Sequence, residues 1–271
     1  TMGLAPLVHH EDGFNADEAE KLKPTRNWYR RVALARASAL VVPSRQLEGV
    51  ALQAWHQPAA KVHRIPNGID TAAYDRKPKR DALPRVVKRP GEKWVGTLAG
   101  LRPVKNLRRL VRAFRALPPE WQLVIVGEGP DREAIVAEAI ALEVGHRVHL
   151  PGHVADPAQA IGLFDIFALS SDSEQFPLSV VEAMAAGLPI ASPAVGDVRD
   201  IVSDENRDFI TPAGDEAALE ATLAAFAWDE ALRRRIGASN QVRARAEFDE
   251  AAMVARYAAL YGGVLGVTQF P

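Results

Sequence analysis

The chain has 271 residues, 48% of them apolar, and its 33 basic and 34 acidic side chains give a formal net charge of −1. This composition fits a globular protein and argues against nucleic acid as a partner, because nucleic-acid binders carry a clustered basic excess. The chain has no cysteine, which excludes disulfides, thiolate nucleophiles and metals bound by cysteine. Its histidines show no His-Glu-x-x-His spacing, so the sequence does not indicate a catalytic metal.

The length suits one full domain and part of another, or two small domains. The first residues, Thr1-Met2-Gly3, do not read as a signal peptide. No apolar run approaches the roughly 20 residues of a membrane span. We therefore expect a cytoplasmic protein.

Along the chain, short apolar runs alternate with stretches of helical periodicity. The runs expected to be strands are 7–9, 40–42, 62–65, 94–98, 123–126, 148–150, 166–169, 190–192 and 209–210. The expected helices include 17–37, 106–117, 131–142, 157–164, 216–228 and 249–261. Because helices that alternate with strands are typical of parallel βαβ units, we predict an α/β fold with a Rossmann-like, doubly wound parallel sheet. Such sheets bind ligands at the carboxyl ends of their strands.

Residues 76–93 differ in composition from the rest of the chain. Basic side chains outnumber Asp81 and Glu92 there, and they stand at Arg76, Lys77, Lys79, Arg80, Arg85, Lys88, Arg89 and Lys93. Together with three prolines, this composition is typical of a solvated domain linker. A surface that contacts a membrane or an acceptor is the alternative interpretation, and would place the protein at the membrane periphery.

Two predicted strands end in glycine-containing turns. Gly127 and Gly129 lie in Val126-Gly-Glu-Gly-Pro130, between a strand and a helix. This Gly-x-Gly spacing indicates either a tight turn or contact with a nucleotide. The next strand runs into Pro151-Gly-His-Val154, where His153 can be an ordinary surface histidine.

The segment 173–190, SEQFPLSVVEAMAAGLPI, contains two glutamates around a predicted helix start. Pro177 suits the first turn of a helix and Gly187 suits its end. Glu174 is therefore expected on the loop before the helix, and Glu182 about a turn into it. A glutamate on a solvated helix face is the plainer alternative for either residue.

The chemistry of this segment suits a nucleotide sugar. Backbone N–H groups around Phe176, Leu178 and Ser179 have no partner within the helix and lie at its positive end, which favours a phosphate. The two carboxylates can each accept hydrogen bonds from sugar hydroxyls. Phosphate and hydroxyl recognition together indicate a nucleotide sugar.

The same segment resembles the Glu-Gly-Phe-Pro and Glu-Ala-Met-Ala stretches of the retaining GT-B glycosyltransferases, in particular family 4, with Gln175 in place of the usual Gly. Residues 61–70, KVHRIPNGID, resemble the end of that family's N-terminal domain. Residues 96–106, GTLAGLRPVKN, resemble its Gly-Arg-Leu-x-x-x-Lys-Asn segment. Lys105 takes the place of the lysine there and Gly100 that of the arginine, so Arg102 would substitute by reaching back.

The resemblance implies transfer of a sugar from a nucleoside-diphosphate sugar, such as a UDP- or GDP-sugar, with retention at the anomeric carbon and without metal or cofactor. The acceptor, a lipid-linked sugar or another molecule, stays unspecified. The resemblance implies that the diphosphate contacts Lys105, Arg102 and the amides of Phe176, Leu178 and Ser179. It implies contact of the nucleotide with the turn at Gly127 and Gly129, and of the nucleobase with His153 and Val154. The ribose would contact Glu182, and the transferred sugar Glu174. A further role near that sugar falls to His10 or to Asp12, which end the first predicted strand and can also be a loop cap.

The resemblance also implies a domain organisation. Residues 1–70 would be part of an N-terminal, acceptor-side Rossmann-like domain, 71–93 a linker, 94–248 the donor-binding domain and 249–271 a helix that crosses back, with a tail. The first half of the family's N-terminal domain has no counterpart, and apolar surface left open would favour self-association. Two rival functions are a non-catalytic nucleotide-sugar-binding or interaction domain and a GT-B epimerase.

Overall fold

The computed structural model describes residues 6–13, 18 and 22–267. Contacts between Cα atoms divide the chain into two compact units, one formed by the residues up to Gly68 and from Phe248 on, the other by Ile69–Glu247. The segment 71–93, which we expected to be a linker, lies within the second unit, where Leu83 is only 2% exposed. The domain boundaries given above stay predictions.

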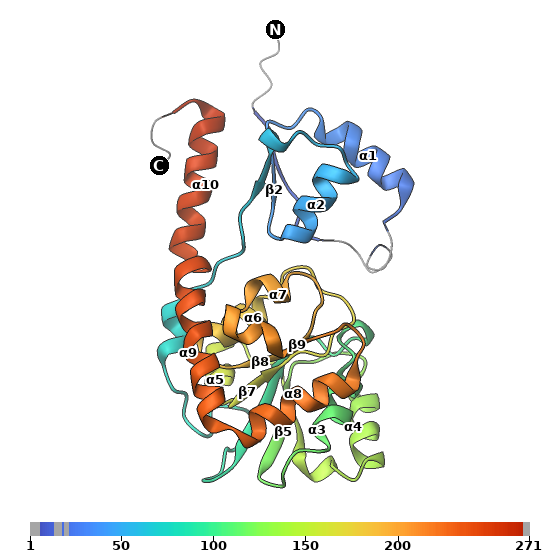
Figure 1. The fold of residues 1–271 in the computed structure, drawn as a ribbon, viewed down its shortest axis with the longest axis vertical. Coiled ribbons are helices and arrows are strands. Elements are labelled where there is room, and N and C mark those ends of the chain that lie inside the picture. The colour runs from blue at the N-terminus through green and yellow to red at the C-terminus, as the bar shows by residue number, and fades with distance from the viewer. Residues whose placement is uncertain (1–5, 14–17, 19–21, 268–271) are drawn as a thin grey trace. The chain divides into compact units, whose positions relative to one another are not determined.

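The first unit contains a parallel sheet in the order β1-β2-β3 (Figure 1). Its strands are β1 Val8–His10, β2 Ala39–Val42 and β3 Val62–Arg64, and its helices are α1 Pro24–Leu34, α2 Arg45–Gln53 and α10 Glu250–Leu265. Every residue of β2 is buried, as a central parallel strand requires. Ser44 begins α2 by accepting a hydrogen bond from the Leu47 N–H.

The second unit contains a six-stranded parallel sheet in the order β6-β5-β4-β7-β8-β9. Its strands are β4 Lys93–Leu98, β5 Trp121–Val126, β6 Val148–Gly152, β7 Ile166–Ala168, β8 Ile190–Pro193 and β9 Ile210–Thr211. The chain order reverses between β4 and β7, which makes this pair the topological switch point of a doubly wound sheet. The predicted α/β fold is confirmed.

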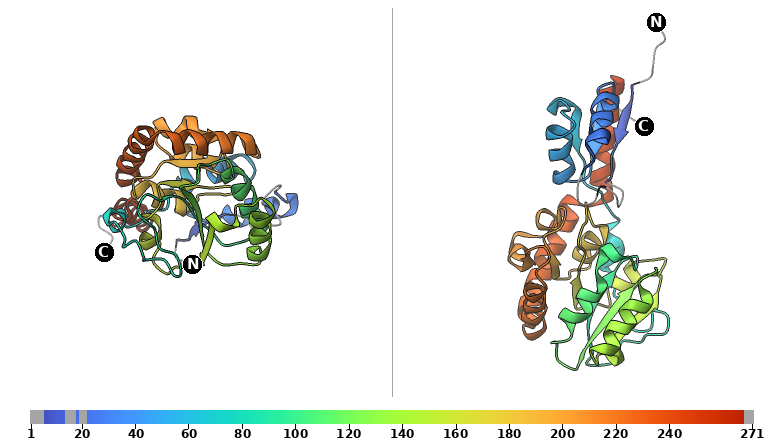
Figure 2. Two further views of the ribbon diagram at one scale, coloured as in Figure 1. Left: turned by 90° about the horizontal axis from the view of Figure 1, so that it is seen from below. Right: turned by 90° about the vertical axis from the view of Figure 1, so that its right-hand side faces the viewer.

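Helices cover the sheet of the second unit on both faces (Figure 2). They are α3 Leu107–Phe114, α4 Arg132–Ala141, α5 Ala158–Ile161, α6 Leu178–Ala185, α7 Val198–Ile201, α8 Glu216–Trp228 and α9 Glu230–Glu247. α3 packs against α4 and α8, while α6 packs against α9. The core under α3 is apolar, with Leu110, Phe114 and Ile125 fully buried.

Several elements differ from the sequence prediction. The sequence analysis did not identify α2 or α9, and the expected helix 17–37 begins at Pro24, with residues 17 and 19–21 outside the described part of the chain. Phe209, expected in a strand, ends the 3₁₀ turn η6 Asp204–Phe209, so β9 starts one residue later. Among the described residues, no helix is long and apolar enough to cross a membrane.

The α6–α9 contact depends on two glycines. Gly187, with φ of 75°, ends α6, and a Cβ added to Gly237 of α9 would lie 2.0 Å from the Gly187 carbonyl oxygen. Beside this contact the buried Asn240 amide donates to the Leu188 carbonyl at 2.9 Å and to Asn206 Oδ1 at 2.7 Å. The close approach of backbones and the buried amides together fix α6, which carries Glu182.

We expect Gly237→Ala to reduce the free energy of unfolding of the second unit by about 2 kcal/mol or more, because helix backbones must separate to admit the methyl group. Chemical denaturation of the purified variant measures this. Gly145→Ala is the matched control, since the nearest atom to its added Cβ is an ordinary 3.5 Å away. Equal stability of the two variants would show that the contact tolerates a side chain.

Candidate functional site

The loops that follow β4 and β7 meet at the carboxyl edge of the second sheet, at the switch point. The first loop contains the 3₁₀ turn η4 Pro103–Lys105, and the second contains residues 170–177. The Asp172 N–H donates to the Val104 carbonyl at 2.9 Å, and the Ser170 hydroxyl donates to the Lys105 carbonyl at 2.9 Å. These backbone contacts hold the two loops side by side.

Lys105 and Glu174 form an ion pair between these loops. Lys105 Nζ lies 2.6 Å from Glu174 Oε1, and the Ser171 hydroxyl donates to the same oxygen at 2.6 Å. The side chains are 20% and 11% exposed, so both charges are largely withdrawn from water. The structure therefore brings together the two residues to which the resemblance assigned the diphosphate and the transferred sugar.

Asp172 forms a second link between the loops. Asn106 donates to both of its carboxylate oxygens, at 3.2 and 3.1 Å, and Arg109 donates to Oδ1 at 2.6 Å. Asn106 itself adopts a left-handed conformation with φ of 43°, which asparagine tolerates better than most residues, and α3 starts directly after it. The sequence analysis missed Arg109 and Asp172, although the polar run at the end of a predicted strand was a usable signal.

Arg102 reaches back over Gly100. A Cβ built on Gly100 would lie 3.2 Å from Arg102 Nε, so the guanidinium occupies space that a larger residue at position 100 would need. Its charge is exposed and makes no ion pair with another described residue. The missing side chain at Gly100 thus makes room for the conformation that we expected of Arg102.

Gly127 and Gly129 have a packing role in the turn after β5. An added Cβ would lie 1.9 Å from the Ala99 carbonyl oxygen at Gly127 and 2.3 Å from the Leu101 carbonyl oxygen at Gly129. The Leu101 N–H also donates to the Glu128 carbonyl at 2.9 Å. The close approach of the neighbouring loop backbone therefore explains why both positions need glycine. Contact with a nucleotide stays a prediction.

His153 and Val154 follow β6 and lie next to this glycine turn. The Gly127 N–H donates to the Gly152 carbonyl at 2.9 Å, which joins the two loops at the same sheet edge. His153 is exposed and Val154 is half-buried. The proximity agrees with a shared binding surface, while the contact of His153 and Val154 with a nucleobase stays a prediction.

The amino end of α6 points its N–H groups toward the same edge. The helix begins at Leu178 after Pro177, and no side chain of the described residues caps it. Leu178 is exposed, while Phe176 and Ser179 are half-buried. The loop before it is fixed by Gly196, because a Cβ there would lie 2.6 Å from the Glu174 and Gln175 carbonyl oxygens. Gln175 Oε1 is buried and has no hydrogen-bond partner among the described residues.

Glu182 lies on α6, which packs against the 3₁₀ turn η3 Thr71–Asp75 that contains Tyr74. Burial raises the pKa of the Glu182 carboxyl, and the interaction with Tyr74 opposes that shift. Burial, followed by the charge of Glu182, raises the pKa of the Tyr74 hydroxyl. Glu182 is thus half-buried and interacts with Tyr74, which does not fit the alternative of a glutamate on a solvated helix face. No local sequence pattern pointed to Tyr74.

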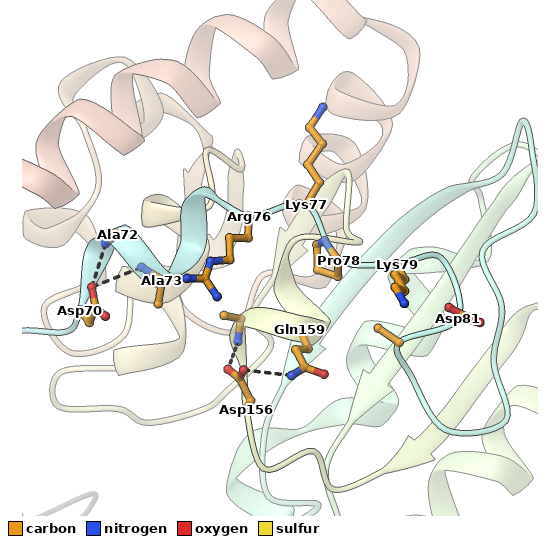
Figure 3. A pocket seen from close by; sticks show the side chains of 12 residues that line it. Asp70, Ala72, Ala73, Arg76, Lys77, Pro78, Lys79, Asp81, Asp156 and Gln159 are labelled. Carbon is orange, nitrogen blue, oxygen red and sulfur yellow. Dashed lines mark hydrogen bonds between the residues drawn. The ribbon is translucent and has the colours of Figure 1, made fainter.

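A cavity of 680 Å³ lies beside η3 (Figure 3). Arg76, Lys77, Asp156 and Gln159 are in its wall, and Asp156 accepts a hydrogen bond from Gln159 at 3.2 Å. Asp156 also raises the pKa of Tyr74 through its charge, after the larger effects of burial and Glu182. The sequence-predicted donor residues do not line this cavity.

His10 and Asp12 belong to the first unit. The His10 ring stacks on Tyr257 of α10 with centroids 5.4 Å apart, and its Nε2 lies 2.9 Å from the Tyr261 hydroxyl. Asp12 is exposed, and its charge adds to the effect of burial in raising the pKa of Tyr257. Both residues therefore neighbour the tyrosines of α10, and the choice between them as the sugar-proximal residue stays open.

Comparison with known proteins identifies the family and the fold of the chain. The pattern of the family Glycosyl transferases group 1 matches residues 79–243, and that of Glycosyltransferase Family 4 matches residues 5–73. The crystal structure of Anabaena Alr3699/HepE in complex with UDP superposes with a TM-score of 0.83 at 22% identity, covering 95% of this chain and 72% of that one. The fold is thus GT-B, and the chain belongs to the glycosyl transferases group 1 family.

Two curated relatives illustrate the range of the family. N-acetyl-alpha-D-glucosaminyl L-malate synthase of Bacillus anthracis is 25% identical over 211 residues, which are 77% of this chain and 55% of that protein. D-inositol 3-phosphate glycosyltransferase of Xylanimonas cellulosilytica is 29% identical over 232 residues, which are 81% of this chain and 56% of that protein. The chain spans little more than half the length of these relatives.

The raised pKa of Glu182 predicts a pH effect on stability. The folded protein holds this proton more tightly than the unfolded chain, so stability is lost as pH rises from the ordinary carboxyl value of 4.5 through the raised one. We expect Glu182→Gln, which does not ionise, to lack this loss. Denaturation of both proteins between about pH 4 and pH 8 measures the difference. A pH-independent difference would contradict the assignment.

Proposed function

We propose that this chain forms the donor-binding part of a glycosyltransferase that takes a sugar from a nucleoside-diphosphate sugar. The observation that carries the proposal is the Lys105–Glu174 ion pair at the switch point of the second sheet, next to the uncapped start of α6. A cation and free helix amides suit a diphosphate, while a carboxylate suits sugar hydroxyls. Membership of the glycosyl transferases group 1 family supports the same reading.

Donor binding would change the partners of the ion pair. An arriving diphosphate competes with Glu174 for Lys105, and sugar hydroxyls donate to the carboxylate oxygens that the lysine gives up. Ser171 would keep Glu174 in place during this exchange, since its hydroxyl bonds the same carboxylate. Arg102, whose guanidinium lies over Gly100 and pairs with no carboxylate of the described residues, supplies a second cation on the same loop.

Glu182 is proposed to accept hydrogen bonds from the ribose. Tyr74 interacts with this carboxyl, whose two oxygens offer several acceptor positions in all. His153 and Val154, which follow the neighbouring strand, are proposed to lie against the nucleobase. The Anabaena structure of the same fold was solved with UDP, which makes UDP a suitable first probe for this chain.

Transfer is proposed to retain the anomeric configuration. As the C–O bond to the diphosphate breaks and an acceptor hydroxyl bonds to the anomeric carbon on the same face, negative charge develops on the leaving oxygen, which takes up the hydroxyl proton. Lys105, Arg102 and the α6 amides stabilise this charge. Glu174 orients the sugar. The acceptor is unspecified, and His10 or Asp12 is proposed to lie near the transferred sugar. No cofactor beyond the donor is proposed, and the cytoplasm is the proposed location, with the membrane periphery as the alternative.

Lys105→Ala is expected to weaken UDP binding about tenfold while leaving uridine binding nearly unchanged, because only the former carries the diphosphate charge. Calorimetric titration with both ligands measures this. Arg102→Ala should give a loss of the same kind if it serves as the second cation. Arg108→Ala, an exposed arginine on the following helix, is the control. An equal loss for UDP and uridine would make Lys105 purely structural.

Incubation with a panel of UDP- and GDP-sugars tests the reaction itself. We expect UDP or GDP release that depends on Glu174 and Lys105, and a product whose anomeric configuration by proton NMR equals that of the donor. Tight nucleotide binding without release would favour the non-catalytic binding domain. An altered free sugar would favour the epimerase, and an inverted product would contradict retention.

Self-association stays a proposal for the first unit. Trp28 and Val32, one turn apart on α1, are 60% and 53% exposed, which is unusual for apolar side chains of this size. The molar mass of the chain in solution, measured by light scattering, tests it.

A further inference from the structure

A cavity of 580 Å³ lies at the edge of the second sheet opposite to Lys105 and Glu174. Its wall contains Lys93, which starts β4, Asp165, which precedes β7, and Pro189, which precedes β8. Because all strands of this sheet are parallel, these residues mark its amino edge. A ligand in this cavity would be separate from the donor, which the proposed function places at the carboxyl edge.

Basic side chains dominate the cavity wall. The cationic groups used below are Lys77, Arg80, Lys88, Lys93, Arg233 and Arg234. The carboxylates of the wall are each engaged by a cation: Asp75 by Arg245, Asp165 by Lys88 and Glu230 by Arg234. A surplus of positive charge is thus left in a concave site, which attracts anions.

Lys77 and Arg80 carry this surplus. Neither side chain makes a hydrogen bond or ion pair within the described part of the chain, although both are in the cavity wall. Figure 3 shows Lys77 leaving the chain on the side opposite to Arg76, although both residues are in the wall of each of the two cavities. Two unpaired cations three residues apart can converge on one polyvalent anion.

The backbone under these cations is fixed by its packing. A Cβ added to Gly162 would lie 2.4 Å from Pro78 Cδ, so the residue after Lys77 sits directly against the end of α5. The Lys88 N–H donates to the Arg80 carbonyl at 2.9 Å, and this closes a loop anchored by the buried Leu83. Lys77 and Arg80 therefore project from a preorganised segment.

The contacts and the pKa of Lys88 indicate how the charges of the cavity wall act on one another. Its ammonium donates to the Leu163 carbonyl at 2.6 Å and to Asp165 at 2.7 Å. Burial lowers the pKa of Lys88, Asp165 opposes this, and the charges of Lys93 and Arg80 lower it further. The cations of the wall thus face one another closely enough to repel, and an anion between them would relieve that repulsion.

We propose that this cavity binds a phosphate-bearing anion, with Lys77 and Arg80 as its principal contacts and Lys88 and Lys93 as the inner charged wall. The volume of 580 Å³ accommodates a phosphorylated small molecule or the headgroup of an anionic lipid. Apolar side chains such as Phe164 and Leu188 line the remainder and suit the organic part of such a ligand.

The test compares anion binding by two double variants, each of which loses one lysine and one arginine and therefore the same positive charge. Lys77→Gln with Arg80→Gln removes the proposed contacts, whereas Lys79→Gln with Arg85→Gln removes one lysine and one arginine from the same segment but outside this cavity wall. Titration with inorganic diphosphate is monitored by calorimetry in the presence of saturating UDP, which occupies the donor site. We expect the first double variant to bind at least about tenfold more weakly, and the second to bind like the original chain.

A second arm identifies the source of the phosphate. Co-sedimentation with phosphatidylglycerol vesicles, with phosphatidylcholine vesicles as the control, tests a lipid headgroup. Vesicle binding that is lost in the Lys77→Gln/Arg80→Gln variant alone supports the site with a lipid as ligand, and diphosphate binding without vesicle binding supports it with a soluble ligand. Equal losses in both double variants, or no binding of either probe, would overturn the proposal, irrespective of whether UDP binds.

Discussion

The ion pair between Lys105 and Glu174 is the interaction on which the carboxyl edge of the second sheet depends. It joins loops that follow neighbouring strands, and because both charges are largely withdrawn from water, losing either partner would leave the other poorly compensated. A ligand that replaces the pair has to offer an anion to the lysine and hydrogen-bond donors to the carboxylate, because otherwise the same cost is incurred.

The helix α6 connects this edge to the rest of the unit. Its first residues present N–H groups beside the ion pair, Glu182 in its middle meets Tyr74, and Gly187 at its end packs on α9. Tyr74 belongs to η3, directly after the point where the chain passes from the first unit into the second. The helix that carries Glu182 therefore packs against the first element of the second unit.

Charge is organised differently at the two edges of the sheet. At the carboxyl edge, Lys105 and Glu174 neutralise one another, and Arg102 on the same loop is an additional exposed cation. At the amino edge, the carboxylates are already engaged and Lys77 and Arg80 stay unpaired among the described residues. A net charge of −1 for the whole chain conceals this local surplus, because the segment 76–93 concentrates the basic residues.

The sequence by itself determined the parallel α/β fold, most of its strands, and the loop and helix positions of Glu174 and Glu182, because these follow from short-range periodicity and from proline and glycine at helix ends. Tertiary structure alone decided that Lys105 pairs with Glu174, 69 residues away, that the turn with Tyr74 packs against the helix with Glu182, and that the segment 71–93 packs into the second unit. These are contacts between residues distant in the chain, and a local pattern contains no information about which side chain the folded backbone will place opposite. Arg102 needed both kinds of information. The resemblance of residues 96–106 to the family motif led us to expect that Arg102 reaches back, and the structure shows that its guanidinium fits in the space above Gly100.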